Sequence, residues 1–181
     1  RGARGLPCGL SADWHDCLKL GCRGESVFVA FQLRFAIKTY IEICHLLKEY
    51  AQLEWAEKQL NELDSAIHKH TWDGEWFLRA YREDGSVIGS SSQSEGSIFL
   101  NTQSWAVISG AATTSQAEKA MDSVFKNLAT DFGIMLCAPS FKTVDYHVIR
   151  AIVLNEGQKE NAGIFCHPQG WAIMAECLLG N

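Results

Sequence analysis

The sequence predicts a mainly α-helical protein built from paired helices, with one small β-hairpin inserted between them. Over most of its 181 residues, apolar side chains recur three and four positions apart, which is the spacing of a helix with a buried face. The spacing changes between Trp72 and Ile88, where aromatic residues cluster and Asp84-Gly85 is typical of a tight hairpin turn. Helical spacing returns after Asn101, so we expect the hairpin to be an insertion.

The first part of the chain is expected to form a loop followed by a helical pair. Glycine and proline interrupt the opening segment, and a helix is predicted to begin at Glu25 or Ser26, either of which suits an N-terminal turn. This helix runs to Leu47 and is apolar on more than one side, so we expect it to be buried around most of its circumference. A polar break near Gln52 and a second apolar stripe over Glu54–His70 predict an antiparallel partner helix.

Three more helices are predicted after the hairpin. Asn101 or Thr102 can cap the first of them, and Ser115 with Glu118 has the spacing of a capping box for the second. Pro168 suits the first position of the last helix, because that position needs no N–H group. The second of these helices has one apolar face, formed by Ala117, Ala120, Met121, Val124 and Leu128.

Composition and charge exclude several classes of protein. Apolar residues make up 47% of the chain and charged residues 20%, a globular balance. The formal net charge of −5 gives no basic field for nucleic acid, and no apolar run is long enough to cross a bilayer. Seven cysteines, an odd number at irregular spacings, favour reduced thiols in a cytoplasmic protein. None of them belongs to a four-ligand zinc pattern, so we expect no metal.

The segment Asp13-Trp14-His15-Asp16 is the first candidate for chemistry. A tryptophan between two carboxylates offers an apolar platform for a sugar ring with an acid beside it. Burial against an indole raises the pKa of a carboxyl group, as a general acid working near neutral pH requires. The same residues also suit a structural role, with the aspartates bonding loop amides and Trp14 in the core. The residues alone leave both interpretations open.

A second candidate is the stretch 159–170, which carries Lys159, Glu160 and, at the front of a predicted helix, His167. Helix N-termini present free amides and partial positive charge, so this arrangement suits an anion. The alternative is a solvated charge pair followed by a capping or core histidine. A third cluster, spanning 145–150, is equally compatible with a structural role and with ligand binding.

Four stretches together resemble the cellobiose phosphorylase family of inverting glycoside phosphorylases. They are GLPCGLSADWHDCLKLG at 5–21, WDGEW at 72–76, NTQSW at 101–105, and the segment 159–171. The resemblance runs in order along essentially the whole chain, so it is more specific than any single motif.

The resemblance implies a fold as well as a function. In this family the catalytic domain is an (α/α)6 barrel, a ring of six helical hairpins. The predicted helix pairs would form part of such a ring, so residues 1–181 are interpreted as part of one catalytic domain. The remainder of the barrel and the β-sandwich that precedes it in the family are then expected outside this chain, which by itself would be an inactive fragment.

By resemblance, the first motif carries the acid and part of the sugar site. Asp16 matches the general acid, Trp14 lines the site of the non-reducing glucose, and Asp13 belongs to the same substrate-binding loop. The family usually has Asn where this chain has His15. An ionisable ring beside the acid could shift its pKa or face away from it.

The stretch 159–171 supplies the rest of the implied site. Lys159 and Glu160 match residues beside the acceptor sugar. His167 matches a phosphate-binding histidine, and Gln169 is its neighbour in the implied phosphate site.

The implied reaction needs only one carboxyl group, because phosphate is already an anionic nucleophile. It is the inverting phosphorolysis of a β-linked gluco-disaccharide such as cellobiose to α-glucose 1-phosphate, the work of a glycosyltransferase-type phosphorylase. Inorganic phosphate is the co-substrate, no other cofactor is required, and a homodimer is one expected assembly of the longer protein. Two alternatives stay open: an inverting hydrolase on a similar ring, and a carbohydrate-binding fragment without catalysis.

Overall fold

The computed structural model describes residues 1–10 and 13–181, so Ser11 and Ala12 of the first motif lie outside the described residues. The described part is mainly helical, as the sequence predicts. Its α-helices are α1 (Val27–Leu47), α2 (Tyr50–His70), α3 (Leu100–Ile108), α4 (Thr114–Leu128) and α5 (Cys166–Leu178). Its strands are β1 (Glu25–Ser26), β2 (Ala80–Tyr81), β3 (Val87–Ile88), β4 (Ile98–Phe99), β5 (Ala129–Thr130), β6 (Gly133–Ile134) and β7 (Cys137–Ala138).

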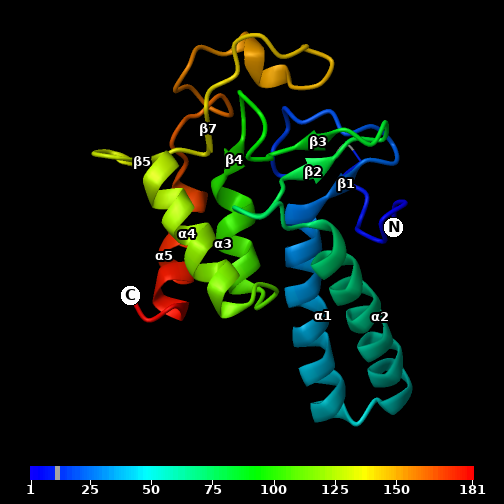
Figure 1. The fold of residues 1–181 in the computed structure, drawn as a ribbon. Coiled ribbons are helices and arrows are strands. Elements are labelled where there is room, and N and C mark those ends of the chain that lie inside the picture. Colours follow the sequence, from blue (N-terminus) through cyan, green and yellow to red (C-terminus); the bar gives the residue numbers. More distant parts are fainter. Residues whose placement is uncertain (11–12) are drawn as a thin grey trace.

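Helices α1 and α2 form the predicted antiparallel pair, which projects from the rest of the molecule (Figure 1). Ser26 caps α1, since its hydroxyl accepts a hydrogen bond from the amide of Val29 at 3.2 Å. The break between the helices lies at Lys48, whose positive φ of 58° ends α1, and not at the predicted Gln52. Gln52 therefore lies inside α2. A residue with a left-handed backbone ends a helix, whereas a polar side chain by itself does not.

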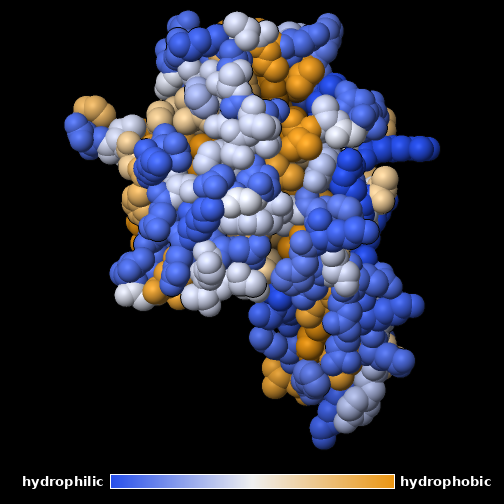
Figure 2. Space-filling model, in the orientation of Figure 1, coloured by the Kyte–Doolittle hydropathy of each residue, from blue (hydrophilic) through white to orange (hydrophobic). Residues whose placement is uncertain are grey.

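The expected burial of α1 is correct only for its first half. Phe28 and Phe31 near its start are fully buried, whereas Leu46 and Leu47 at its end are 82% and 66% exposed. Figure 2 shows hydrophobic residues at the surface of the projecting α1–α2 pair. The reason is geometric: only the first half of α1 lies against the sheet and α3, and α2 alone covers one side of the second half.

The predicted hairpin is confirmed and belongs to a larger sheet. Strands β2 and β3 pair antiparallel around Asp84-Gly85, where Gly85 has a φ of 87° that favours glycine. Strand β1, the two residues before α1, adds to the other edge of β2, with Ser26 opposite Ala80. The sheet therefore ties the start of α1 to the hairpin.

Helices α3, α4 and α5 form the second helical group, in which α3 packs against α1, α4 and α5. The five residues predicted for the apolar face of α4 are all buried, which confirms that face. The capping box of α4 is formed by Thr113 and Gln116, two positions before the predicted Ser115 and Glu118. Both pairs have the required spacing, and the chain uses the earlier one.

The starts of α3 and α5 also differ from the prediction. Phe99 is the N-cap of α3, so Asn101 and Thr102 lie inside the helix, buried and not capping. Pro168 is the third residue of α5, whose first is Cys166. A proline is tolerated there because the first turn of a helix makes few internal N–H bonds.

The loops gather at one end of the molecule. Helices α1, α3 and α5 all begin at this end, and the long segment from β7 to α5 covers it (Figure 1). Strand β7 pairs with β4, which leads into α3, and a short 3-10 helix, Arg150–Val153, lies within the segment. No helix in the described residues is both long and apolar enough to span a membrane. The loop end is where the predicted site residues meet.

Candidate active site

Asp13 lies in the interior and not at a surface that a sugar could reach. Its carboxylate is paired at both oxygens with the guanidinium of Arg79, and Oδ2 also accepts a hydrogen bond from the Ser26 hydroxyl at 2.6 Å. Burial by itself would raise the pKa of Asp13, but the charge and hydrogen bonds of Arg79 outweigh it and lower the pKa to about 2. The predicted contact between Asp13 and substrate is therefore corrected: its oxygens are occupied by protein groups.

Arg79 has no exposed surface, which is unusual for an arginine. It precedes strand β2, and its amide and carbonyl join the backbone at Ile88 and Val27. Its guanidinium carbon lies 5.2 Å from the ring centre of Phe28 and 5.9 Å from that of Phe99. The charge is thus enclosed by aromatic faces and neutralised by one carboxylate.

His15 is also fully buried, with its ring edge-to-face against Phe99 at 5.6 Å between centres. Burial first, and then the nearby charge of Arg79, lower the pKa of His15 to about 3, although Asp13 opposes this. Within the described residues neither ring nitrogen makes a hydrogen bond of normal geometry, although the backbone of Glu160 lies beside the ring. His15 is therefore a neutral core side chain that faces away from solvent.

Asp16 is exposed, and the structure does not bury its carboxyl group against Trp14 as the sequence led us to expect. Its backbone carbonyl accepts a hydrogen bond from Nζ of Lys19 at 3.3 Å, which holds the main chain at this point. No hydrogen bond of the described residues involves the Asp16 carboxylate itself. The group is thus free to meet a substrate.

Trp14 is half-buried and faces the start of α5. Its ring centre lies 5.5 Å from that of Phe165, 6.4 Å from that of His167 and 5.7 Å from that of Trp171. His167 is exposed and stacks on Trp171 with an angle of 25° between the ring planes. The fold therefore brings Trp14 of the first motif together with His167 of the second.

The same motif lies close to Glu160 and to the third cluster. The amide of Arg150 donates to the carbonyl of Cys17 at 2.9 Å, and the amide of Lys19 donates to Val148 at 3.0 Å. Burial raises the pKa of the Cys17 thiol, and the charges of Glu160 and Asp16 raise it further. Glu160 is half-buried, so a second carboxylate stands near the loop of Asp16.

Lys159 and Glu160 sit in a tight turn that glycine makes possible. Lys159 has a positive φ of 44°, and its carbonyl accepts a hydrogen bond from the amide of Gly163 at 2.9 Å. A Cβ atom on Gly163 would lie 2.4 Å from that carbonyl oxygen, so the turn needs glycine there. The side chain of Lys159 is exposed, as a substrate contact requires.

Gln169 is committed to the backbone and not to an anion. Its side-chain oxygen accepts from the amide of Ile134 at 2.8 Å, and its nitrogen donates to the carbonyls of Ile134 and Phe165 at 2.8 and 3.1 Å. The amide therefore fastens strand β6 to the first turns of α5. Gln169 supports the helix that carries His167, which corrects its predicted place in the phosphate site.

Sequence reasoning missed three residues that shape the site. Asn161 is fully buried and bonds both the amide and the carbonyl of Phe141, which anchors the loop of Lys159. Trp171 touches both Trp14 and His167, and Arg79 holds Asp13. Arg79 had a visible signal, since it is a lone charge in the apolar run Phe77–Tyr81.

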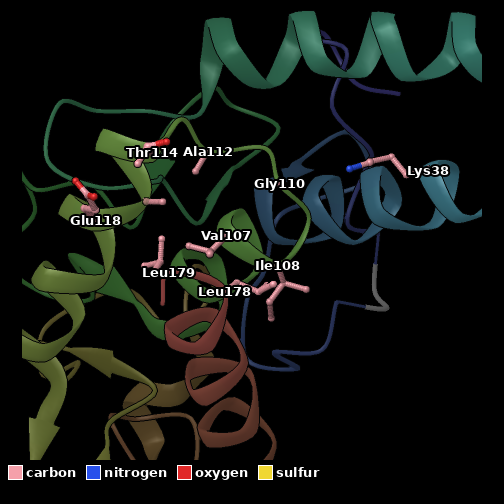
Figure 3. A pocket seen from close by; sticks show the side chains of 10 residues that line it. Lys38, Val107, Ile108, Gly110, Ala112, Thr114, Glu118, Leu178 and Leu179 are labelled. Atoms are coloured by element: carbon pink, nitrogen blue, oxygen red, sulfur yellow. The ribbon is translucent and has the colours of Figure 1, made fainter. Parts of the chain in front are cut away.

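A pocket of about 420 Å³ lies elsewhere, between α1, the turn after α3 and the end of α5 (Figure 3). Val107, Leu178 and Leu179 form much of its apolar wall, with Lys38 and Glu118 at its edges. None of the predicted site residues lines it. It is separate from the loop end of the molecule.

The arrangement at the loop end suits acid catalysis beside a bound anion. An exposed carboxylate, Asp16, follows Trp14, which lies against His167 in the first turn of α5. Within the described residues no side chain caps this turn, so the amides of Cys166 and His167 are available to an anion, whereas Pro168 has none. Helices α1 and α3 begin at the same end, so their partial positive charges also favour an anion there.

Residues 1–181 match the family described as the glycosyl hydrolase 94 superfamily, catalytic domain. The chain belongs to this family, which confirms the resemblance to glycoside phosphorylases seen in the motifs.

Several curated relatives are disaccharide phosphorylases. The chain is 38% identical to N,N'-diacetylchitobiose phosphorylase of Vibrio furnissii, over 99% of the chain and 22% of that protein. It is 32% identical to solabiose phosphorylase of Paenibacillus borealis, over 99% of the chain and 24% of that protein. It is 30% identical to cellobionic acid phosphorylase of Neurospora crassa, over 92% of the chain and 22% of that protein. The chain thus spans less than a quarter of each relative.

Proposed function

We propose that the protein containing this chain catalyses the inverting phosphorolysis of a β-linked disaccharide of gluco-configured sugars. In this reaction Asp16 protonates the glycosidic oxygen, while inorganic phosphate attacks the anomeric carbon from the opposite face. The product is a sugar 1-phosphate with the α configuration. The observation that carries the proposal is the contact of Trp14, two residues from an exposed Asp16, with His167 at the start of α5.

Each group has a role that its environment supports. Trp14 offers an aromatic face for a sugar ring. His167 and the backbone amides at the start of α5 together suit phosphate. We propose that Lys159 and Glu160 contact the acceptor sugar, which their exposed and half-buried side chains allow. We propose that these residues belong to one partial (α/α)6 barrel, whose other hairpins lie outside residues 1–181.

For the substrate, cellobiose is the first candidate and N,N'-diacetylchitobiose the second. Cellobiose follows from the motifs, and the second disaccharide appears in the names of two relatives, at 38% and 36% identity. Both are β-linked disaccharides of gluco-configured sugars, so the same acid and phosphate groups would serve either.

The alternative that remains within this chemistry is an inverting hydrolase, which needs a second carboxylate to activate water. Asp13 is unsuited to that role, because it is buried in an ion pair that lowers its pKa to about 2. Glu160 is then the carboxylate near Asp16 that a hydrolase would use.

The deciding experiment uses the full-length protein with cellobiose, N,N'-diacetylchitobiose, solabiose and cellobionic acid, with and without inorganic phosphate. We expect cleavage of at least one disaccharide only when phosphate is present, with an α-sugar 1-phosphate as the product in the NMR spectrum. Equal cleavage without phosphate, giving two free sugars, would instead identify a hydrolase. Binding of a disaccharide without any cleavage would support a carbohydrate-binding role.

A further inference from the structure

The buried ion pair between Asp13 and Arg79 is costly to build, so its location needs an explanation. The exposed fractions of the two side chains are 5% and 0%. Removing two charges from water costs several kcal/mol per ion, and such a pair often stabilises a fold no better than apolar residues would. Stability alone therefore explains the pair poorly.

The pair joins three segments that are distant in sequence. Asp13 belongs to the loop of the first motif, Arg79 precedes strand β2, and Ser26 caps α1 while donating its hydroxyl to Asp13. Arg79 Nη1 also donates to the Ser26 oxygen at 3.2 Å. A Cβ atom on Gly89, directly after β3, would lie 2.6 Å from the Cβ of Arg79, so this position has room only for glycine. The guanidinium is thus fixed from several sides.

Asp13 transmits this fixed position to the loop. Its Oδ1 accepts a hydrogen bond from the backbone amide of His15 at 3.0 Å. His15 is the residue between Trp14 and Asp16, so this bond holds the main chain at the point from which both side chains leave. On one side Trp14 reaches Trp171 and His167, and on the other Asp16 is exposed.

We propose that Asp13 and Arg79 are positioning residues, which hold the loop so that Asp16 meets the glycosidic oxygen while Trp14 stays against α5. This proposal rests on the function proposed above. Neither side chain touches substrate, and both act through the backbone of His15. Displacing a reacting group by about 1 Å can lower a rate about 100-fold. Holding the loop in place therefore explains why the chain keeps a buried pair that adds little to stability.

A matched ion pair elsewhere in the chain provides the control. Arg34 of α1 contacts both carboxylate oxygens of Asp64 in α2, at 2.7 and 3.2 Å, and donates to the carbonyl of Ser109. This pair is less deeply buried, and it too joins segments distant in sequence. None of its printed bonds reaches the described residues of the first motif. Arg34→Lys and Arg79→Lys therefore make the same chemical change in two places.

The test compares these two variants of the full-length protein on two substrates. One is a disaccharide with a poor sugar leaving group, and the other is an aryl β-glycoside whose acidic leaving group needs no protonation. For Arg79→Lys we expect kcat on the disaccharide to fall about 100-fold, with a several-fold smaller loss on the aryl glycoside. Arg34→Lys should change both substrates alike and only slightly.

Hydrogen exchange of the segment 13–18 gives a second readout that is independent of activity. We expect exchange there to accelerate in Arg79→Lys and to stay unchanged in Arg34→Lys. If Arg79→Lys does not fold, Ser26→Ala replaces it. This change removes the hydroxyl's bonds to Asp13, to Arg79 and to the Val29 amide, and it leaves the ion pair in place. Unchanged exchange, or losses that are equal on the two substrates, would overturn the positioning role.

The failure of the proposed function would look different. If Asp16→Asn itself loses activity equally on both substrates, Asp16 is not the acid and the proposed mechanism fails. The exchange measurement would still decide whether Arg79 and Asp13 hold the loop.

Discussion

The two ends of helix α1 are built in opposite ways. At its start, the apolar residues are buried against the sheet and α3, and the polar groups nearby, Asp13 and Arg79, are enclosed and paired. At its end, Leu46 and Leu47 are exposed, and between the two ends the ion pair of Arg34 with Asp64 is only partly buried. The comparison shows that burial and pairing of side chains are concentrated at the end of α1 that carries the candidate site, and not at the projecting end.

The largest effect is expected at the acid itself. Asp16→Asn removes the transferable proton and keeps the size of the side chain, so phosphorolysis of a disaccharide should fall by about 10²- to 10⁴-fold. An aryl glycoside with an acidic leaving group should lose much less. Steady-state kinetics on the full-length protein checks this, with Asp122→Asn on the exposed face of α4 as the control. A similar loss for Asp122→Asn would show that carboxylates matter here only through stability.

The next effect concerns the stability of the buried pair. Asp13→Asn leaves the charge of Arg79 buried and unpaired, which typically costs about 3 to 5 kcal/mol in the free energy of unfolding. Asp64→Asn, in the more exposed pair, should cost no more than about 1 kcal/mol. Chemical denaturation of both variants measures the difference. Equal losses would mean that the deeper burial of the Asp13–Arg79 pair makes no difference to stability.

The pair also predicts a loss of stability in acid. Folding lowers the pKa of Asp13 from 3.8 to about 2, so as the pH falls the unfolded state binds a proton before the folded state does. The contribution of the ion pair to the free energy of unfolding is therefore complete above about pH 4. It should disappear as the pH falls from about 4 to about 2. Asp13→Asn should lack this part of the acid transition, as a denaturation series across that range would show.

His15 predicts a separate pH dependence over a wider and less acidic range. Folding lowers its pKa from 6.5 to about 3, so the unfolded state binds more protons between these values and stability falls as the pH falls below about 6.5. The contribution to the slope is at most about 1.4 kcal/mol per pH unit. His15→Asn should remove it, whereas His147→Asn, at an exposed position, should not. An unchanged slope in His15→Asn would place the acid sensitivity elsewhere.

The smallest effect is expected at the projecting end of α1. Leu47→Ser replaces an exposed side chain and should change the free energy of unfolding by less than about 0.5 kcal/mol, while Phe28→Ala at the other end should cost about 3 to 5 kcal/mol. Thermal and chemical melts of the full-length protein measure both. A large loss for Leu47→Ser would show that this end is covered in the longer protein.

The site was predictable in part from residue types. The first motif and the stretch 159–170 stood out because carboxylates, an indole and a histidine in loops are typical of catalytic sites, and the fold brings Trp14 and His167 into contact. Their division into exposed and buried groups was not predictable. Asp13 and Asp16 are chemically identical and three positions apart, yet one is buried in an ion pair and the other is exposed.

What the sequence determined by itself is local. The apolar face of α4, the start of α1 at Glu25 or Ser26 and the turn at Asp84-Gly85 depend on residues close together in the chain, so spacing and turn chemistry were enough to predict them. The choice of Ser26 as the cap came from the structure. Only the tertiary structure decided that Asp13 meets Arg79, which lies 66 positions away, and that the second half of α1 is exposed. Such contacts depend on which surfaces pack together, and no local pattern records that choice.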